Sequence, residues 1–267
     1  MNESEVTHTH NWKGMGTIFR PLVSVVMPIY HTEEYLHESV ASILNQTIPD
    51  IKLLAICDSN QYEVHEILES FHDIRLHIYT LNKNTNVPAA MNLVRNLVDG
   101  KYVARMDSDD ISLPDRFEKQ VAFLESHPDV GVVGGQIDYI KPDGHHEPRR
   151  WVWFPTSYAG ILWALSKYNP IANPTFMMRA DLYKRTEWDT SFVSGIEDYD
   201  YWVRLADKTK ICNLPDDVLK YRLKDISKLS ALAFYNRNDQ RKADEKLIRD
   251  KATGIFWRNW KRILGVY

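Results

Sequence analysis

The alternation of short apolar runs with segments of helical spacing constrains the fold of this 267-residue chain more than any other feature. Apolar runs bounded by polar residues predict buried strands. They lie at residues 22–28, 51–57, 74–79, 102–106 and 131–140. Segments with apolar residues three and four positions apart predict amphipathic helices. They span residues 33–45, 64–71 and 88–98. Strands that alternate with helices imply an α/β fold with a mostly parallel central sheet flanked by helices.

The composition narrows the class of protein. With 44% hydrophobic and 26% charged residues, the chain fits one large α/β domain or a domain with an appendage. A formal net charge of −3 argues against general nucleic-acid binding. Cys57 and Cys212 are the only cysteines, so we expect no disulfide framework and a reducing compartment. The first 16 residues have no signal-peptide pattern and no run is long enough to span a bilayer, which predicts a cytoplasmic protein.

Polar side chains follow three of the predicted strands. Tyr30 follows the first strand, Asp58 the second, and Asp107 the fourth. Because ligands of open parallel sheets bind at the carboxyl ends of the strands, these residues are expected to share one site.

The cluster Asp107-Ser108-Asp109-Asp110 is a candidate metal site. Carboxylates at positions i and i+2 of a strand point to opposite faces, so they converge on one cation only where the backbone turns. Residues 111–114 provide such a turn. Neighbouring carboxylates raise one another's pKa, and Mg²⁺ or Mn²⁺ relieves that repulsion. A solvated acidic turn that caps the helix beginning near Pro114 explains the spacing equally well.

The sequence excludes two common ways of holding phosphates. No Gly-x-Gly-x-x-Gly follows the first strand, and no Gly-Lys-Ser/Thr loop occurs anywhere. A cation on Asp109 could instead bridge two phosphate oxygens, while Asp58 accepts a hydrogen bond from a base N–H. Together these describe a nucleoside diphosphate site. Asp58 is alternatively a turn residue without a ligand.

Three segments together resemble the family 2 glycosyltransferases. They span residues 23–30, 34–47 and 104–116, and the similarity extends over roughly residues 22–222. The resemblance implies a GT-A fold, a nucleotide-sugar donor such as a UDP-sugar, a divalent metal (Mn²⁺ or Mg²⁺), and sugar transfer with inversion. It also implies a glycan or lipid-linked oligosaccharide acceptor in surface polysaccharide biosynthesis, and hence a hexosyl- or N-acetylhexosaminyltransferase.

The resemblance assigns roles on the donor side. Pro28 and Tyr30 would line the uridine pocket, and Asp58 would contact the base. Asp107 would face the ribose and the metal, with Ser108 beside it, and Asp109 would be the direct metal ligand.

The family's Glu-Asp motif matches Glu197-Asp198, which implies that Asp198 is the general base and that Glu197 lies beside the acceptor. The chemistry needs a carboxylate there, because the acceptor hydroxyl loses a proton as it attacks. Alternatively, both carboxylates cap the helix that runs to Ala206.

The chain departs from the family pattern at several positions. Asn86 replaces a usual glycine, an exchange that is tolerable because asparagine visits the left-handed region readily. Asn173 stands where histidine is frequent, which alters the expected acceptor contacts. Lys224 also replaces a histidine; it could contact phosphate but cannot ligate a metal while protonated.

Aromatic residues mark the expected acceptor side. Trp151 and Trp153 could stack on sugar faces, although a role as core or cover is at least as good an explanation.

The C-terminal segment is basic and amphipathic. From Lys220 onward 13 Lys and Arg stand against 5 Asp and Glu, a net charge of +8, which leaves −11 for residues 1–219. Within residues 243–264 apolar side chains recur at helical spacing among basic ones. This predicts a helix that either lies at the inner face of the cytoplasmic membrane as a peripheral anchor or packs on the catalytic domain.

These observations predict a flexible tail, a GT-A domain in two halves and a basic helical appendage. The boundaries are 1–21 for the tail, 22–115 for the nucleotide-sugar half, 116–225 for the acceptor half and 226–267 for the appendage. Two other classes remain as alternatives. A nucleotidyltransferase would carry a Gly-rich basic loop after the first strand, where this chain has Pro28-Ile29-Tyr30-His31. A non-catalytic nucleotide-sugar or glycan-binding module at the membrane would bind a donor without releasing the nucleotide.

Overall fold

A computed structural model describes most of the chain. It covers residues 6–8, 21–30, 33–58, 62–81, 85–148, 154–192, 195–223 and 238–263. The strands are β1 (Val6–His8), β2 (Val23–Ile29), β3 (Ile51–Asp58), β4 (Leu76–Leu81), β5 (Tyr102–Arg105), β6 (Ile111–Ser112), β7 (Val130–Ile140), β8 (Met177–Arg179) and β9 (Lys210–Arg222). The helices are α1 (Glu33–Leu44), α2 (Tyr62–Glu69), α3 (Val87–Leu93), α4 (Arg116–Ser126), α5 (Tyr158–Leu165), α6 (Ala180–Arg185), α7 (Glu197–Ala206) and α9 (Asn238–Ile263). Two short 3₁₀ segments are η2 (Val94–Leu97) and η3 (Asn173–Thr175).

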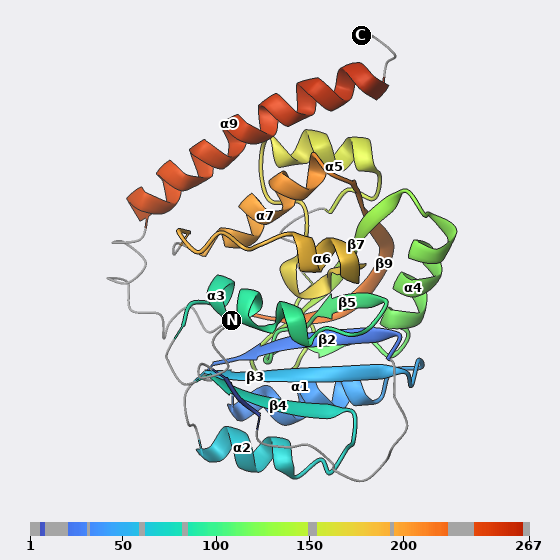
Figure 1. Cartoon of the computed structure of the whole chain (residues 1–267), viewed down its shortest axis with the longest axis vertical. Coiled ribbons are helices and arrows are strands. Elements are labelled where there is room, and N and C mark those ends of the chain that lie inside the picture. The colour runs from blue at the N-terminus through green and yellow to red at the C-terminus, as the bar shows by residue number, and fades with distance from the viewer. Residues whose placement is uncertain are drawn as a thin grey trace.

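Within the described residues these strands form one sheet in the order β1-β4-β3-β2-β5-β8-β7-β9-β6 (Figure 1). The neighbours β4, β3, β2 and β5 are parallel, as the alternation of strands and helices predicts. Beyond β5 the sheet is mixed, because β8 runs antiparallel to both β5 and β7. The chain moves to one side of β2 to build β3 and β4 and to the other side to build β5, so the carboxyl end of β2 is a topological switch point.

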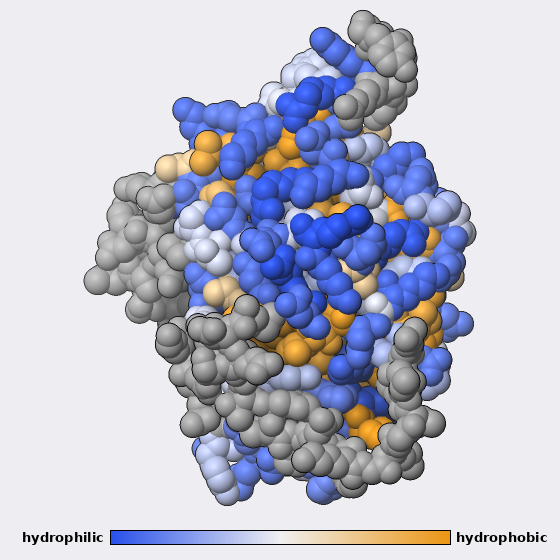
Figure 2. All heavy atoms as spheres, in the orientation of Figure 1, coloured by the Kyte–Doolittle hydropathy of each residue, from blue (hydrophilic) through white to orange (hydrophobic). Residues whose placement is uncertain are grey.

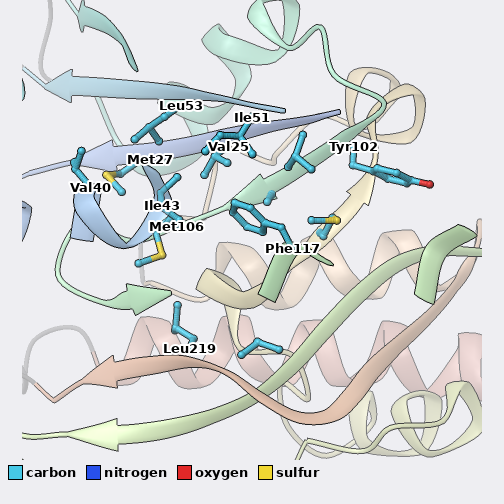
Figure 3. Packing of buried hydrophobic residues seen from close by; sticks show 14 of the residues in the cluster. Val25, Met27, Val40, Ile43, Ile51, Leu53, Tyr102, Met106, Phe117 and Leu219 are labelled. Carbon is cyan, nitrogen blue, oxygen red and sulfur yellow. The ribbon is translucent and has the colours of Figure 1, made fainter. Parts of the chain in front are cut away.

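Alternating residues of β2 pack on opposite faces of the sheet. Figure 3 shows Val25 and Met27 beside Val40 and Ile43 of α1, and all four side chains are fully buried. Val26 joins the second cluster, on the other face of the sheet. Both faces of the parallel half are therefore covered, which explains why its strands are apolar runs without polar alternation.

The helix predicted at residues 88–98 changes geometry before its end. It is α-helical through Leu93 and continues as η2. Asn86 caps its first turn by accepting a hydrogen bond from Ala89 N at 2.9 Å, with φ −75° and ψ 161°. The left-handed conformation considered for Asn86 is thus wrong, because its side chain serves as an N-cap that requires extended backbone.

The C-terminal helix α9 packs on the body of the protein beside α5 and α7 (Figure 1). Ile248, Ala252 and Ile255 are buried in the second cluster, whereas Leu247 and Trp257 are about half exposed. One side of the helix therefore packs on the protein, and part of its apolar residues remain exposed on the other side. Hydrophilic residues cover most of the face seen in Figure 2. Among the described helices, none has an apolar stretch long enough to cross a membrane.

Candidate functional site

A pocket of about 510 Å³ opens at the carboxyl ends of the parallel strands. We call it the strand-end pocket. Its lining comes from the ends of β2, β3 and β4, from the start of α3 and from the segment before α7. The lining residues are Pro28, Ile29, Tyr30, Ile56, Leu81, Thr85, Asn86, Val87, Pro88, Ala90, Phe192, Gly195 and Glu197. The pocket thus forms at the carboxyl end of β2, on the side of β3 and β4, at the edge where an open α/β sheet binds its ligands.

The structure brings two of the predicted donor-side residues into this pocket. Pro28 and Tyr30 both line it, and Tyr30 is 55% exposed. Pro28 is accommodated because the pairing of β2 with β5 ends at Val26, so no strand on that side needs its missing N–H. The backbone of Asp58 pairs with Leu81, which lines the pocket, while the side chain of Asp58 lies outside the described residues.

The acidic cluster forms a turn immediately after β5. Met106 N still donates to Val26 O at 3.1 Å, and Asp110 N then donates to Asp107 O at 3.4 Å. Asp107 and Asp109 are partly exposed, whereas Ser108 and Asp110 are buried. The turn therefore presents the two carboxylates of the Asp-x-Asp spacing and withdraws the residues between and after them.

Arg222, at the end of β9, holds this turn. Its backbone N donates to Asp110 Oδ1 at 2.8 Å and its Nε donates to Asp109 O at 2.8 Å. The guanidinium also pairs with Glu38 Oε2 at 2.6 Å and lies over the Tyr35 ring at 4.3 Å. The sequence does not mark Arg222 as part of the site, because it reaches Asp110 from 112 positions away.

Arg105 connects the acidic turn to the predicted base. Its Nε donates to Asp107 Oδ1 at 2.9 Å, and the side chain is buried. Burial alone would lower the pKa of Arg105, but the charges of Asp107, Asp198 and Glu197 raise it above its usual value. Arg105 therefore stays charged between carboxylates that lie far apart in the sequence. Its position directly before the acidic cluster is the signal that could have identified it.

A second buried arginine supports the same strand end. Arg116 Nη2 donates to Arg105 O at 2.7 Å, and Arg116 Nε donates to Gln120 Oε1 at 3.2 Å. Burial lowers the pKa of Arg116 to about 9, while the charges of Asp110 and Asp107 oppose that shift.

The first turn of α7 positions the Glu-Asp motif. Gly195 precedes it with φ +76°, a conformation that favours glycine. Asp198 Oδ2 accepts a hydrogen bond from Asn169 Nδ2 at 2.8 Å, and its Oδ1 accepts one from Tyr199 N at 2.8 Å. Asp198 thus contacts a backbone N–H of the first turn, as the capping alternative expects. That contact leaves the carboxylate facing a cavity.

Burial and the charge of Glu197 raise the pKa of Asp198 to about 6. The charge of Arg105 and the hydrogen bonds from Tyr199 N and Asn169 act in the opposite direction. A carboxylate with a pKa near 6 is ionised at neutral pH and is still basic enough to accept a proton.

The cavity that Asp198 faces has a volume of about 690 Å³ and lies between α7 and α9. We call it the α9 pocket. Its lining residues are Lys167, Tyr168, Asn169, Gly195, Ile196, Asp198, Tyr199, Arg241, Glu245 and Arg249. Gly195 lines both pockets, Glu197 lines the strand-end pocket and Asp198 lines the α9 pocket. The first turn of α7 therefore separates the two cavities.

Asp107 and Asp109 are two partly exposed carboxylates, the kind of ligand that a divalent cation binds. In the described part of the chain no group of three or more His, Cys, Asp and Glu side chains is placed to hold a metal ion. Both aspartates lie close to Asp110. Burial is the main cause that raises the pKa of the Asp110 carboxyl, and the charges of Asp107 and Asp109 raise it further. Two partly exposed carboxylates leave the other positions to water and substrate oxygens, which is common for Mg²⁺.

Of the remaining predicted residues, the structure describes Asn173, which lines neither pocket. Asn173 begins η3 and is partly buried, and its buried Oδ1 has no hydrogen-bond partner among the described residues. Trp151, Trp153 and Lys224 lie outside the described residues.

Comparison with known proteins gives a consistent result. Residues 24–186 match the family model described as glycosyl transferase family 2. The O-antigen biosynthesis glycosyltransferase WbnJ of Escherichia coli is 33% identical over 222 residues, covering 80% of this chain and 85% of WbnJ.

Solved structures show the same fold at low identity. TarS of S. aureus, crystallised with UDP-GlcNAc, aligns with a TM-score of 0.61 at 21% identity over 76% of this chain; the aligned part spans 59% of that TarS chain. The mannosyltransferase PcManGT of Pyrobaculum calidifontis, in complex with GDP-Man and Mn²⁺, aligns with a TM-score of 0.65 at 20% identity, covering 91% of this chain and 70% of PcManGT. The predicted GT-A fold is confirmed.

Proposed function

We propose that this chain, which belongs to glycosyl transferase family 2, binds a nucleotide-sugar donor at the strand-end pocket and an acceptor in the α9 pocket. One observation carries the proposal: Glu197 and Asp198 are adjacent in sequence, yet they line different pockets on either side of the first turn of α7. A sugar held at this boundary lies between the leaving group and a carboxylate that can activate the attacking hydroxyl.

The donor assignment rests on the position of the strand-end pocket at the carboxyl ends of the parallel strands β2, β3 and β4. Pro28 and Tyr30 would contact the nucleoside, and Asp58 would accept a hydrogen bond from the base. A divalent cation bound by Asp107 and Asp109 would neutralise the charge that develops on the departing diphosphate. The complexes of TarS with UDP-GlcNAc and of PcManGT with GDP-Man and Mn²⁺ support a metal-bound nucleotide sugar, and we favour a UDP-sugar.

Asp198 would act as the general base. The acceptor hydroxyl attacks the anomeric carbon from the face opposite the diphosphate, so the configuration inverts, and Asp198 takes the hydroxyl proton. Asn169 and Tyr199 N hold both carboxylate oxygens, which fixes the direction in which that proton is accepted. The transferred sugar would be a hexose or an N-acetylhexosamine, and the acceptor a glycan or lipid-linked oligosaccharide of a surface polysaccharide, by analogy with WbnJ.

Release of UDP from a panel of UDP-sugars in the presence of Mn²⁺ and a mixed acceptor extract tests the proposal. We expect Asp198→Asn to reduce transfer by roughly 10²- to 10⁴-fold while donor binding, followed by calorimetry, persists. Asp207→Asn is the matched control, because Asp207 caps the C-terminus of the same helix, lines neither pocket and, among the described residues, forms its ion pair with Arg258. Near-normal transfer by Asp198→Asn would exclude it as the base. Donor binding without nucleotide release for any donor would favour the non-catalytic module.

Some assignments stay predictions. Ser108 is buried, so it would support the acidic turn from the protein interior and would contact the donor less directly than the partly exposed Asp107 and Asp109. Lys224 would contact the diphosphate, and Trp151, Trp153 and Asn173 would contact the acceptor.

We also propose that the enzyme works at the inner face of the cytoplasmic membrane, through the side of α9 that faces away from the domain. Trp257 is exposed there together with Lys246 and Lys261. Basic residues attract anionic lipids, and tryptophan favours the headgroup region. Vesicle flotation with phosphatidylglycerol should show that Trp257→Ala combined with Lys246→Glu and Lys261→Glu reduces binding. Equal flotation of the variant and the wild type would contradict a role for this surface.

A further inference from the structure

We propose that the α9 pocket recognises an anionic group on the acceptor, a phosphate or a carboxylate, with Arg249 as the main contact and Lys167 as a second. This inference rests on the proposed function, because it takes the cavity beside Asp198 as the acceptor site. The inference specifies the chemical class of the acceptor, an anionic glycan or glycolipid, which the nucleotide-binding half of the molecule does not determine.

The positions of the α9 residues support the proposal first. Arg241, Glu245 and Arg249 are four residues apart, so they share one side of the helix, and all three line the pocket. Arg241 Nε donates to Glu245 Oε1 at 3.0 Å, so the positive charge of Arg241 is balanced by the negative charge of Glu245. Arg249 and Lys167 are the other two cations that line the cavity, and neither forms an ion pair with another described residue.

Arg249 differs from two other basic residues of α9, which are paired, and from the exposed lysines of the helix, because it is partly buried and lines the pocket. Lys251 is 3.5 Å from Asp200, and Arg258 is 3.4 Å from Asp207. Arg249 is partly buried, yet among the described residues its guanidinium has no hydrogen-bond or ion-pair partner. A guanidinium has five N–H donors in a fork that matches a phosphate or a carboxylate. Its donors would otherwise be satisfied only by water in the cavity.

The electrostatics connect Arg249 to the base. Burial raises the pKa of Tyr199 to about 12, and the charge of Arg249 acts against this shift. Tyr199 follows Asp198 directly and its backbone N donates to Asp198 Oδ1. Arg249 is thus within electrostatic reach of the residue that holds the base. An acceptor anchored at Arg249 by its anion could direct a hydroxyl toward Asp198 within the same cavity.

Two sources could provide this anion. One is the phosphate that links a sugar to a lipid carrier, and the other is a uronic acid within the glycan. Either anion would place negatively charged oxygens against Arg249. The structure therefore predicts that an anion binds there, and the experiment below distinguishes a phosphate from a carboxylate.

Titration calorimetry of the full chain tests the inference without turnover. The probes are glucose 1-phosphate, methyl β-glucuronide and neutral methyl β-glucoside, in EDTA so that no anion binds through a metal ion. We expect the wild type to bind at least one anion more tightly than the neutral glycoside. Arg249→Gln should weaken that binding about tenfold, and Arg249→Lys should retain part of it. Arg258→Gln, an exposed arginine of the same helix outside the pocket, is the matched control and should bind like the wild type.

The outcomes separate this inference from the proposed reaction. Tighter binding of glucose 1-phosphate assigns the anion to a lipid linkage, and tighter binding of the glucuronide assigns it to the glycan. Equal affinity of the wild type and Arg249→Gln for both anions, or no measurable binding of either anion by the wild type, overturns the inference. If the enzyme releases no nucleotide from any donor, the proposed reaction is wrong. The difference in anion binding between the wild type and Arg249→Gln is measured without turnover and does not depend on that result.

Discussion

At the scale of single residues, Asp198 is subject to opposing requirements of folding and chemistry. The carboxyl is partly buried beside Glu197, which favours its protonated form, whereas proton transfer needs the ionised form. Arg105, Asn169 and Tyr199 N keep the pKa at about 6 instead of higher. Ionising Asp198 at neutral pH therefore costs stability that the fold recovers elsewhere.

We expect Asp198→Asn to raise the Tm at pH 7. The pKa of Asp198 in the folded state, about 6, exceeds its ordinary value of 3.8, so the folded protein is stabilised by protonation and loses that stabilisation as the pH rises from about 4 to about 6. Asparagine resembles the neutral form and avoids the loss. Each kcal/mol gained corresponds to roughly 2–4 °C in Tm for a chain of this size. Calorimetric scans should show the advantage at pH 7 and its disappearance below about pH 4; a Tm advantage that is equal at both pH values would contradict this origin.

Asn169 is expected to set the pH dependence of the reaction. Its hydrogen bond stabilises the ionised form of Asp198, so Asn169→Leu should raise the pKa of that carboxyl. Because the base must be ionised, the acidic limb of the kcat/KM profile, expected near pH 6, should move to higher pH. Asn92→Leu offers a comparison, since Asn92 bonds Trp188 and does not line either pocket. An unchanged acidic limb in Asn169→Leu would exclude this tuning role.

The residues that could be predicted are those whose chemistry is concentrated locally. Asp107 and Asp109 are visible because three carboxylates follow an apolar run, and the pair Glu197-Asp198 is visible through its family motif. Arg222 and Asn169 could not be found in this way, because each reaches its carboxylate from a distant part of the chain. Single arginines and asparagines are common, and only the folded geometry separates these two from the others.

At the scale of secondary structure, Gln46 joins the end of α1 to the segment that leads into α4. Its Nε2 donates to Leu113 O at 2.8 Å and to Ser112 Oγ at 3.1 Å, while its Oε1 accepts from Phe117 N at 3.2 Å. The side chain is buried, and it is the acceptor for Phe117 N, whereas Leu113 O also accepts a hydrogen bond from Arg116 N at 3.1 Å.

Gln46→Leu should destabilise the protein by about 1–3 kcal/mol, the cost of leaving the buried N–H of Phe117 without its acceptor. Urea unfolding followed by circular dichroism measures the difference. Thr47→Ala, at the exposed neighbour that bonds Glu118, should change the free energy of unfolding by less than about 0.5 kcal/mol. If the two variants lose equal stability, the network around Gln46 is not responsible.

The parallel half of the sheet could be predicted because each strand is buried on both faces and is therefore an apolar run. β8 and the pairing of β7 with β9 could not. β8 has three residues, too few to show a period, and its place between β5 and β7 depends on non-local hydrogen bonds. Local patterns thus determine where strands occur, while the order of the mixed half depends on contacts between distant segments.

At the scale of the whole molecule, α9 decides how much of the chain forms the folded unit. The sequence shows an amphipathic basic helix, but the same pattern suits a lipid surface and a protein surface. The structure uses Ile248, Ala252 and Ile255 for packing near α5 and α7, and it leaves Trp257 and several lysines outside.

Ile248→Ala should therefore cost about 2–5 kcal/mol, as expected for a large side chain truncated in a core. Leu247→Ala, at the half-exposed neighbouring position, should cost much less. Calorimetry measures the Tm of both variants, which differ in whether the truncated side chain of α9 is buried or exposed. A single transition with a lower Tm for Ile248→Ala would show that α9 unfolds together with the domain, and equal Tm values for the two variants would show that it does not.

The two pockets share Gly195 and the first turn of α7, and take the rest of their walls from different segments. The region that matches the family model ends at residue 186, so α9 lies beyond it. On the proposed assignment of the two pockets, exchange of this helix between relatives would change the preference for an acceptor without altering the residues that hold the nucleotide.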